Sequence, residues 1–374
     1  MSHWVFHNPV RIAFGEGAFD QIGHAIGGRS FVLVTNNEPA LLPWRERIAQ
    51  VCGQPLLTLD SIAPNPDLAT LRLLSEELRD LGRTPELFVA LGGGSAIDAA
   101  KFLAAGHGQF EELVASIEAG TPLPRPALPF IAIPTTAGTG SDLTRWATVW
   151  DNAGGRKLSL ERDDLFAEAS FIDPLIMASL PWSVALASGL DALSHALESI
   201  WNISANPLTR DFAVRGARDV MAALPLLHAD RNDADARARL ARGAMRASLA
   251  FSNTRTALAH NLSYPITLQH GVPHGIACSF SLPEVMAAVI GVDPECDAAL
   301  GEIMGPLVDA PMRLRAFLDS LGVPASAQAL KITPDAWVVM VDQAFAGPRG
   351  RNFIGSRERF SLVPISAVNA GGGE

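Results

Sequence analysis

Two short apolar segments that run directly into glycine-rich loops constrain the fold of this chain most strongly. LFVALGGG (87–94) and PFIAIPTTAGTGS (129–141) each indicate a β-strand followed by glycines, and the helical pattern SAIDAAKFLAAG follows the first. An earlier strand, SFVLVTNN, precedes the helical pattern LATLRLLSEELRDLG. This alternation of buried strands and helices predicts a parallel sheet flanked by helices.

Helical patterns dominate the second half of the chain. PWSVALASGLDALSHALESIW, TRDFAVRGARDVMAALPLLH and ADARARLARGAMRASLAFSN all carry apolar residues at helical spacing, and candidate strands become sparse. At 374 residues the chain is also too long for one ordinary core. We therefore predict an α/β domain over 1–180 and an all-helical domain over 181–374. We interpret the ARARLAR tract as a solvated basic face.

The net charge and the apolar pattern of the chain argue against nucleic acid and membrane as partners. Lys and Arg number 29 against 39 Asp and Glu, a formal charge of −10, which argues against a nucleic-acid binder. No run of about 18 apolar residues predicts a membrane span, and the N-terminal segment lacks the pattern of a signal peptide. Cys52, Cys278 and Cys296 form no CxxC pair, so we expect reduced thiols in a soluble cytoplasmic protein.

The two glycine-rich loops predict a nucleotide site. Glycines between a strand and a helix let a phosphate approach the backbone, and the helix N-terminus adds free N–H groups. The first loop is neither GxGxxG nor GxxxxGK[ST], and taken alone it could be only a tight turn. Two such loops at strand ends suit a cofactor lying across the edge of a sheet. The candidate contacts are Gly92, Gly93, Gly94, Ser95, Thr135, Thr136, Thr139 and Ser141.

Asn36 bears on the choice between NAD and NADP. An acidic residue that binds the adenosine ribose usually follows an early strand, and here that strand ends in VTNN. An aspartate at this position would repel a 2′-phosphate, whereas an asparagine would not, so Asn36 favours NADP. An ordinary turn asparagine is the competing interpretation.

One acid and three histidines predict a metal site. SGLDALSHALESIW places Asp191 and His195 four residues apart, on one face of a helix. Such a pair alone is more often a helix-start acid and a core histidine. With His260 and His274 added, one oxygen and three nitrogens form a complete ligand set, which suits Fe, Zn, Cu or Ni. A catalytic metal would also need an open coordination position.

Five motifs together resemble one family. GGGSAIDAAK, PTTAGTGSD, SGLDALSHALE, AFSN…AH and VPHG occur in the order found in the iron-containing (group III metal-dependent) alcohol dehydrogenases. The resemblance extends from NPVRIAFGEG to the RGRN segment near the end of the chain. It implies a Rossmann-like dinucleotide-binding domain, a helical metal-binding domain, an active site in the cleft between them, and a homodimer.

The resemblance also implies roles for particular residues. The family's metal ligands match Asp191, His195, His260 and His274, with Fe²⁺ favoured and Zn²⁺ as the alternative. Its pyrophosphate loop matches residues 92–95 and Asp98, its threonine loop matches Thr135, Thr136 and Ser141, and its lysine near the cofactor ribose matches Lys157. Asp98 could equally be a first-turn helix acid, and Lys157 a solvated surface lysine.

Two departures from the family pattern point to the substrate. Tyr264 in SYP replaces a histidine that many members carry, and Arg145 beside Trp146 follows the second loop. An arginine facing the cleft could bind a phosphonate, phosphate or carboxylate through two hydrogen bonds. A surface or interdomain salt bridge is the alternative for Arg145. A second candidate anion cluster consists of Arg349, Arg351 and Asn352.

Within the family, TRWATVWD, SYP and the late GRN segment resemble the phosphonoacetaldehyde reductases of phosphonate antibiotic biosynthesis. We therefore expect NADPH- or NADH-linked reduction of a small anionic aldehyde, such as phosphonoacetaldehyde, to a primary alcohol, here 2-hydroxyethylphosphonate. The metal would act as a Lewis acid on the carbonyl oxygen. His270 could relay a proton or have no role, and Tyr264 could contact the substrate or pack in the interior.

Several other activities compete with this expectation. Another small aldehyde or a polyol is an alternative substrate. A dehydroquinate synthase-like lyase shares the fold, but it would need more basic substrate contacts in the helical half. A maleylacetate reductase-like enzyme would act without a metal, which the complete ligand set argues against. A non-catalytic nucleotide- or metal-binding protein would not need both intact loops and intact ligands.

Overall fold

The chain forms two compact units. The computed structural model describes residues 3–123 and 125–362. His7–Pro181 forms one unit, here called the α/β unit, and the segment before His7 joins the chain from Trp182 onward in the second, here called the helical unit. We describe each unit by itself.

A six-stranded parallel sheet forms the centre of the α/β unit, with the strand order β1-β8-β5-β4-β2-β3. Its strands are β1 (Arg11–Phe14), β2 (Phe31–Thr35), β3 (Leu57–Leu59), β4 (Leu87–Gly92), β5 (Phe130–Pro134) and β8 (Ala169–Ile172). The predicted parallel sheet is therefore confirmed. An antiparallel hairpin of β6 (Trp146–Asp151) and β7 (Arg156–Glu161) lies outside this sheet.

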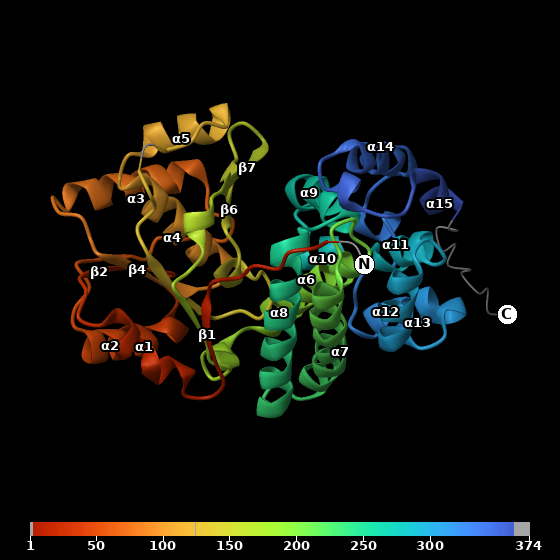
Figure 1. Ribbon diagram of the computed structural model, residues 1–374, viewed down its shortest axis with the longest axis horizontal. Coiled ribbons are helices and arrows are strands. Elements are labelled where there is room, and N and C mark those ends of the chain that lie inside the picture. Colours follow the sequence, from red (N-terminus) through yellow and green to blue (C-terminus); the bar gives the residue numbers. More distant parts are fainter. Residues whose placement is uncertain (1–2, 124, 363–374) are drawn as a thin grey trace. The chain divides into compact units, whose positions relative to one another are not determined.

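Helices cover both faces of the sheet (Figure 1). They are α1 (Ile22–Ile26), α2 (Leu42–Cys52), α3 (Leu68–Asp80), α4 (Gly94–Gly106) and α5 (Phe110–Ala119). The first two lie on one face, where Ile22 and Ile48 join Leu33 and Ile131 of the sheet in one buried apolar cluster. Strand residues are apolar without alternation because helices bury both sides of a sheet of this kind.

The chain changes direction within the sheet after β3. It runs from β2 outward to the edge strand β3 and then returns to the other side of β2 to form β4. The carboxyl ends of β2 and β4 therefore mark a topological switch point, which is where open α/β sheets bind their ligands. Asn36 follows β2 and the glycine loop follows β4, so the predicted cofactor residues lie at this point.

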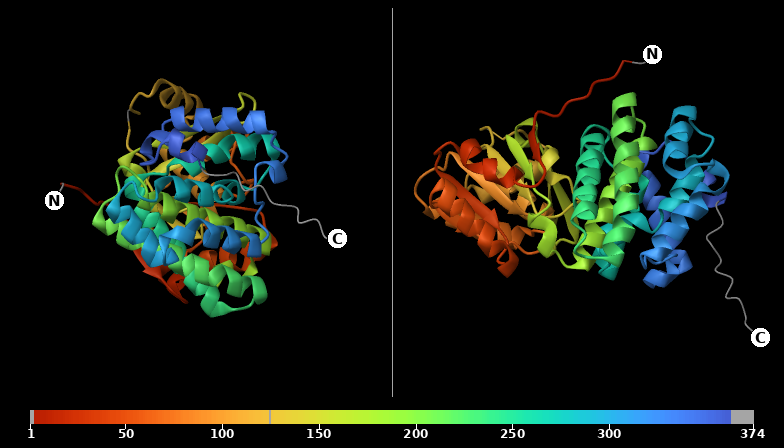
Figure 2. Two further views of the ribbon diagram at one scale, coloured as in Figure 1. Left: turned by 90° about the vertical axis from the view of Figure 1, so that its right-hand side faces the viewer. Right: turned by 90° about the horizontal axis from the view of Figure 1, so that it is seen from below.

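The helical unit contains α6 (Trp182–Ile200), α7 (Pro207–Ala229), α8 (Ala234–Thr254), α9 (Leu258–His270), α10 (His274–Ser279), α11 (Leu282–Val289), α12 (Pro294–Met304), α13 (Ala310–Ser320), α14 (Pro334–Ala346), the short η8 (Gly350–Asn352) and α15 (Arg357–Leu362). The long helices α7 and α8 pack side by side (Figure 2). Asn206 starts α7 with a capping box to Thr209, and Asp233 caps α8.

The basic face of α8 contacts an acid on α7. Asp219 accepts from Arg239 at 3.2 Å, from Arg242 at 3.1 Å and from Arg246 at 2.5 Å. Arg239 and Arg242 belong to the ARARLAR tract, and their side chains are half exposed. The predicted solvated face thus also pairs with a carboxylate on the neighbouring helix, which the periodicity of α8 could not reveal.

No helix in the described ranges combines the length and the apolar composition needed to cross a membrane.

Candidate functional site

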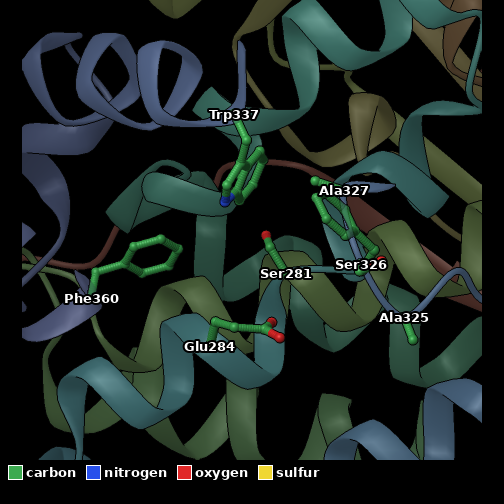
Figure 3. Close-up of a pocket in the computed structure, with 8 residues that line it drawn as sticks. Ser281, Glu284, Ala325, Ser326, Ala327, Trp337 and Phe360 are labelled. Atoms are coloured by element: carbon green, nitrogen blue, oxygen red, sulfur yellow. The ribbon is translucent and has the colours of Figure 1, made fainter. Parts of the chain in front are cut away.

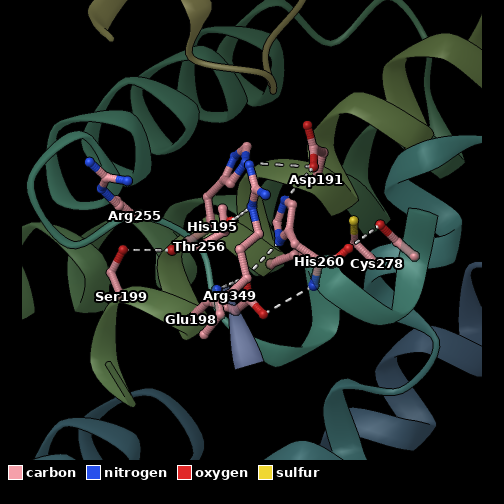
Figure 4. A network of polar contacts seen from close by, with 12 residues as sticks. Asp191, His195, Glu198, Ser199, Arg255, Thr256, His260, Cys278 and Arg349 are labelled. Carbon is pink, nitrogen blue, oxygen red and sulfur yellow. Dashed lines mark hydrogen bonds and ion pairs between the residues drawn. The ribbon is translucent and has the colours of Figure 1, made fainter. Parts of the chain in front are cut away.

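The structure brings together four side chains of the helical unit, here called the acid–histidine cluster: Asp191, His195, His260 and His274. Asp191 and His195 lie one turn apart on α6, His260 lies in the first turn of α9, and His274 begins α10. Oδ1 of Asp191 lies 3.3 Å from Nε2 of His260, 3.8 Å from Nε2 of His195 and 3.9 Å from Nε2 of His274. Figure 4 shows Asp191, His195 and His260 converging.

Gly275 allows α10 to approach α6. A Cβ atom at this position would lie 1.8 Å from the carbonyl oxygen of Ala187 and 3.0 Å from the amide nitrogen of Asp191. Any side chain would therefore force the two helices apart. The glycine after His274 thus sets the distance between His274 and Asp191.

The cluster fits a divalent metal. Oδ1 of Asp191 and Nε2 of His260 are buried and have no hydrogen-bond partner among the described residues, which is costly unless a ligand compensates for it. Nitrogen and oxygen donors around a tetrahedral zinc-like ion lie about 3.3 Å apart, close to the separations seen here. The donor atoms of Asp191, His260, His274 and Cys278 all lie within 4.8 Å of one another, a set that does not include His195.

Glu198 holds His260 in place, a role that the sequence interpretation missed. Its Oε2 accepts from Nδ1 of His260 at 2.6 Å and from the amide of Ala257 at 2.8 Å, and its Oε1 accepts from the amide of His260 at 3.1 Å (Figure 4). The Nδ1 contact directs Nε2 toward Asp191 and makes it a better metal ligand. The spacing of 191, 195 and 198 along one helix face could have indicated this.

The two carboxylates stay charged. Burial alone would raise the pKa of Asp191, but the positive charge of nearby His195 and contacts with His260 and His274 hold that pKa well below its usual range. Burial opposes ionisation of Glu198 as well, and His260 and the backbone amides outweigh it and lower the pKa of that carboxyl. Both carboxylates are therefore in the charged form that can pair with a cation.

Tyr264 and Arg349 adjoin His274. The ring of Tyr264 stacks on His274 with centroids 5.9 Å apart and planes inclined by 6°. The guanidinium of Arg349 lies 5.1 Å from the centroid of the Tyr264 ring, and its Nε donates to Oγ1 of Thr256 at 2.9 Å. Sequence reasoning named Arg349 as a candidate anion contact together with Arg351 and Asn352. Figure 4 shows Arg349 in the same network as His260 and Glu198.

His270 lies apart from this cluster. It is exposed and ends α9, about 15 Å further along the helix axis than His260. Its role as a proton relay stays a prediction.

In the α/β unit, the two predicted cofactor loops pack against each other. The amide of Thr135 donates to the carbonyl oxygen of Gly92 at 3.0 Å. A Cβ atom on Gly94 would lie 2.7 Å from Oγ1 of Thr139, and one on Gly93 would lie 3.1 Å from Cγ2 of Thr136. The glycines therefore leave room for the threonine side chains of the second loop, whether or not a phosphate binds there.

Asn36 and Ser95 lie beside these loops. Nδ2 of Asn36 donates to the carbonyl of Ile62 at 2.7 Å, and its Oδ1 would lie 2.8 Å from a Cβ atom on Gly92. Oγ of Ser95 accepts from the amide of Asn65 at 3.1 Å. Both side chains thus bind the segment 62–65, Asn36 from the end of β2 and Ser95 from the first loop. Their predicted contacts with a cofactor stay predictions.

A buried lysine joins the loops to the hairpin, and sequence reasoning passed over it. Lys101 on α4 donates to the carbonyls of Thr144 at 2.7 Å and Trp146 at 2.8 Å. Burial lowers its pKa to about 8 against the opposing charges of Asp98 and Asp142. Asp98 is itself buried, accepts from the amide of Thr148 at 2.9 Å, and has its pKa raised by desolvation.

Ser141, Lys157 and Arg145 are the remaining predicted site residues of the α/β unit. Ser141 is buried at the start of a short helical turn after the second loop. Lys157 lies on β7, with its Nζ 5.9 Å from the ring centroid of Trp150. Arg145 forms ion pairs with Glu161 at 3.0 Å and Asp163 at 2.8 Å. Because both acids neutralise its guanidinium, Arg145 matches the salt-bridge interpretation better than the anion-binding one.

Asn352 forms hydrogen bonds with backbone groups of the helical unit, and Arg351 lies beside it. Arg351 is exposed, while Nδ2 of Asn352 donates to the carbonyl of Thr256 at 2.8 Å and its own carbonyl accepts from the amide of Ile203 at 2.8 Å. Asn352 therefore ties η8 to the connection between α8 and α9.

A small pocket of the helical unit includes none of the predicted site residues. It is lined by Phe280, Ser281, Glu284, Ala325, Ser326, Ala327, Trp337 and Phe360 (Figure 3). Its volume of about 30 Å³ admits only molecules the size of water. It is therefore no candidate for the substrate site.

Comparison with known proteins decides the family. Residues 9–174 match the family model described as iron-containing alcohol dehydrogenase, and residues 185–355 match the C-terminal model of the Fe-containing alcohol dehydrogenase family. The chain belongs to the iron-containing alcohol dehydrogenase family. It is therefore a nicotinamide-dependent oxidoreductase that interconverts an alcohol and an aldehyde.

Three relatives illustrate the range of the family. A phosphonoacetaldehyde reductase of Streptomyces viridochromogenes is 31% identical over 307 residues, 75% of this chain and 76% of that protein. An NAD-dependent methanol dehydrogenase of Bacillus methanolicus is 28% identical over 362 residues, 91% of this chain and 93% of that protein. The crystal structure of a sulfoacetaldehyde reductase from Bifidobacterium kashiwanohense in complex with NAD⁺ superposes with a TM-score of 0.85 at 26% identity, covering 96% of this chain and 97% of that chain.

Proposed function

We propose that this iron-containing alcohol dehydrogenase reduces a small aldehyde that carries an anionic group, with phosphonoacetaldehyde as the leading substrate and 2-hydroxyethylphosphonate as the product. The observation that carries the proposal is the position of Arg349. Its guanidinium lies over Tyr264, which stacks on the candidate metal ligand His274. Two relatives named for anionic aldehydes, phosphonoacetaldehyde and sulfoacetaldehyde, support the same substrate class.

Arg349 has donors available for an anion. Nε is engaged by Thr256, whereas Nη1 and Nη2 donate to no described residue, and no described carboxylate pairs with the guanidinium. A planar guanidinium with two such donors suits two hydrogen bonds to a phosphonate. Arg145 offers the opposite case, since two acids pair with it. We therefore assign the anion contact to Arg349 rather than to Arg145 or Arg351.

The remaining residues of the helical unit would position the aldehyde. Asp191, His195, His260 and His274 would hold the divalent metal, and Glu198 would keep Nε2 of His260 turned toward it. When bound, the nicotinamide supplies the hydride, and the metal supplies the positive charge that stabilises the developing alkoxide. His274, whose side chain is 33% exposed, adjoins Tyr264 and thus marks the side on which an aldehyde would enter.

The choice of cofactor rests on Asn36, and the choice of metal rests on the family and on the donor atoms. We propose NADPH over NADH because Asn36, at the end of β2, carries no charge that would repel a 2′-phosphate. Fe²⁺ is the favoured metal by family membership, with Zn²⁺ as the alternative that the same donors accept. His270, exposed at the end of α9, is the candidate proton relay.

The test compares two arginine variants on two aldehydes. We expect Arg349→Gln to raise KM for phosphonoacetaldehyde roughly 10- to 100-fold, because it removes a charge-assisted pair of hydrogen bonds, and to leave KM for propanal unchanged. Arg145→Gln is the matched control and should change neither value, since its charge is used by Glu161 and Asp163. The measurement is steady-state NADPH oxidation with each aldehyde.

Two results would contradict the proposal. An equal rise in KM for both aldehydes would mean that Arg349 does not recognise the anion, which would favour a neutral aldehyde or a polyol as substrate. Absence of oxidation of either reduced cofactor with phosphonoacetaldehyde, by a metal-loaded protein that acts on another aldehyde, would contradict the proposed substrate.

A further inference from the structure

Cys278 lies against the acid–histidine cluster, although its sequence gives no sign of a special role. It follows His274 by one turn on α10 and is fully buried. Its Sγ lies 3.6 Å from Nε2 of His274 and 3.9 Å from Nδ1 of the same ring. Nδ1 of His274 lies 3.4 Å from Oγ of Ser263, so Nε2 is the nitrogen that faces both the sulfur and Asp191.

The donor atoms around Cys278 have the spacing of a coordination sphere. The sulfur and the donor atoms of Asp191, His260 and His274 all lie within 4.8 Å of one another. In a tetrahedral zinc-like centre, sulfur and nitrogen ligands lie about 3.6 Å apart and nitrogen and oxygen ligands about 3.3 Å apart. The observed separations are 3.6 Å for Cys278 to His274 and 3.3 Å for His260 to Asp191.

Two of these atoms lack any other partner. Nε2 of His260 and Oδ1 of Asp191 belong to residues that are 2% and 4% exposed, and neither forms a hydrogen bond within the described residues. A thiol beside them could be only a small buried hydrophobe, as free cysteines often are. The unsatisfied nitrogen and oxygen argue instead for an ion that all of these donors share.

We propose that Cys278 is an additional ligand to the divalent metal, so that this chain holds its metal through a thiolate as well as through Asp191 and imidazoles. On binding, the S–H bond breaks heterolytically, the proton leaves to the buffer, and the sulfur donates an electron pair to the metal; nothing is oxidised or reduced. A soft thiolate shifts the preference of the site toward Zn²⁺ relative to a set of only oxygen and nitrogen donors. The inference does not depend on which aldehyde is reduced.

Cobalt substitution tests the bond directly. The full-length protein is stripped of metal, loaded with Co²⁺ and examined by absorption spectroscopy, which reports thiolate-to-cobalt charge transfer in the near ultraviolet and ligand-field bands in the visible range. We expect charge transfer in the wild-type protein and in Cys296→Ser, and its loss in Cys278→Ser with the visible bands retained. Cys296 is the matched control because it is also a buried helical cysteine, on α12, outside the donor set.

A wild-type protein that shows cobalt ligand-field bands without charge transfer would overturn the proposal, and this outcome does not depend on whether any variant folds. Persistence of the charge-transfer band in Cys278→Ser would overturn it as well. A competition titration adds a second measure: Cys278→Ser should lose more than about tenfold in affinity for Zn²⁺. Unchanged affinity for Zn²⁺ would show that the sulfur is not a ligand.

Discussion

Two buried carboxylates in the helical unit have opposite surroundings. Asp219 on α7 is 7% exposed, and three guanidinium groups of α8 contact its two oxygens. Asp191 on α6 is 4% exposed and has three imidazoles within 3.9 Å, yet its Oδ1 accepts no hydrogen bond within the described residues. The arginines satisfy both oxygens of Asp219, whereas the histidines leave Oδ1 of Asp191 without a hydrogen bond among the described residues. A satisfied cluster stabilises the fold, and an unsatisfied one indicates a ligand.

The largest effect should come from removing the charge of the unsatisfied carboxylate. We expect Asp191→Asn to lose more than about a hundredfold in metal affinity and to lose aldehyde reduction with it. The metal-free variant should have an unfolding temperature close to that of the metal-free wild-type protein, because an amide fits the same space. Metal content after dialysis and thermal unfolding of both metal-free proteins measure the two effects. Full metal occupancy in Asp191→Asn would show that the charge of Asp191 is not needed to bind the metal.

An intermediate effect is expected at Glu198, which has all of its partners within the chain but acts on a candidate ligand. Glu198→Gln keeps the shape and loses the charge that orients His260, so metal affinity should fall roughly 10- to 100-fold. Isothermal titration with Zn²⁺ measures this. Glu284→Gln serves as the control, since Glu284 pairs with Arg315 at 3.0 Å outside the cluster. Equal losses in both variants would point to general destabilisation instead of positioning.

The smallest effect on the metal should come from the satisfied carboxylate. Asp219→Asn leaves three arginines without their common acid, so we expect the free energy of unfolding to fall by about 1–3 kcal/mol. Metal affinity should stay at the wild-type value. Denaturant unfolding and metal titration measure the two quantities, with the exposed Asp211 on the same helix providing Asp211→Asn as a control that should stay within about 0.5 kcal/mol. A loss of metal affinity in Asp219→Asn would couple the two clusters.

Much of the fold could be predicted from the sequence because it rests on local pattern. The strands LFVALGGG and PFIAIP are continuously apolar, as strands buried on both faces must be, and both are central strands of the confirmed parallel sheet. The β6–β7 hairpin lies outside that sheet, and its pairing depends on contacts between segments that no local pattern records.

Less of the candidate site could be predicted, because partners across helices have no fixed spacing in the sequence. Asp191 and His195 share a face by helical periodicity alone. The contact of Glu198 with His260, and that of Cys278 with His274 and Asp191, depend on how α6, α9 and α10 pack. The sequence alone cannot tell whether Arg145 or Arg349 is available to an anion. In the structure, Arg145 pairs with two acids, whereas no described carboxylate pairs with Arg349.

Gly275 has a consequence for how this chain can diverge. Because its missing side chain lets the backbones of α10 and α6 touch, every substitution there would move His274 away from Asp191 whatever the substrate. Tyr264 and Arg349 carry no such constraint, since their contacts are made by side-chain tips. New substrate preferences can thus arise by exchange at 264 and 349, while 275 tolerates no change at all.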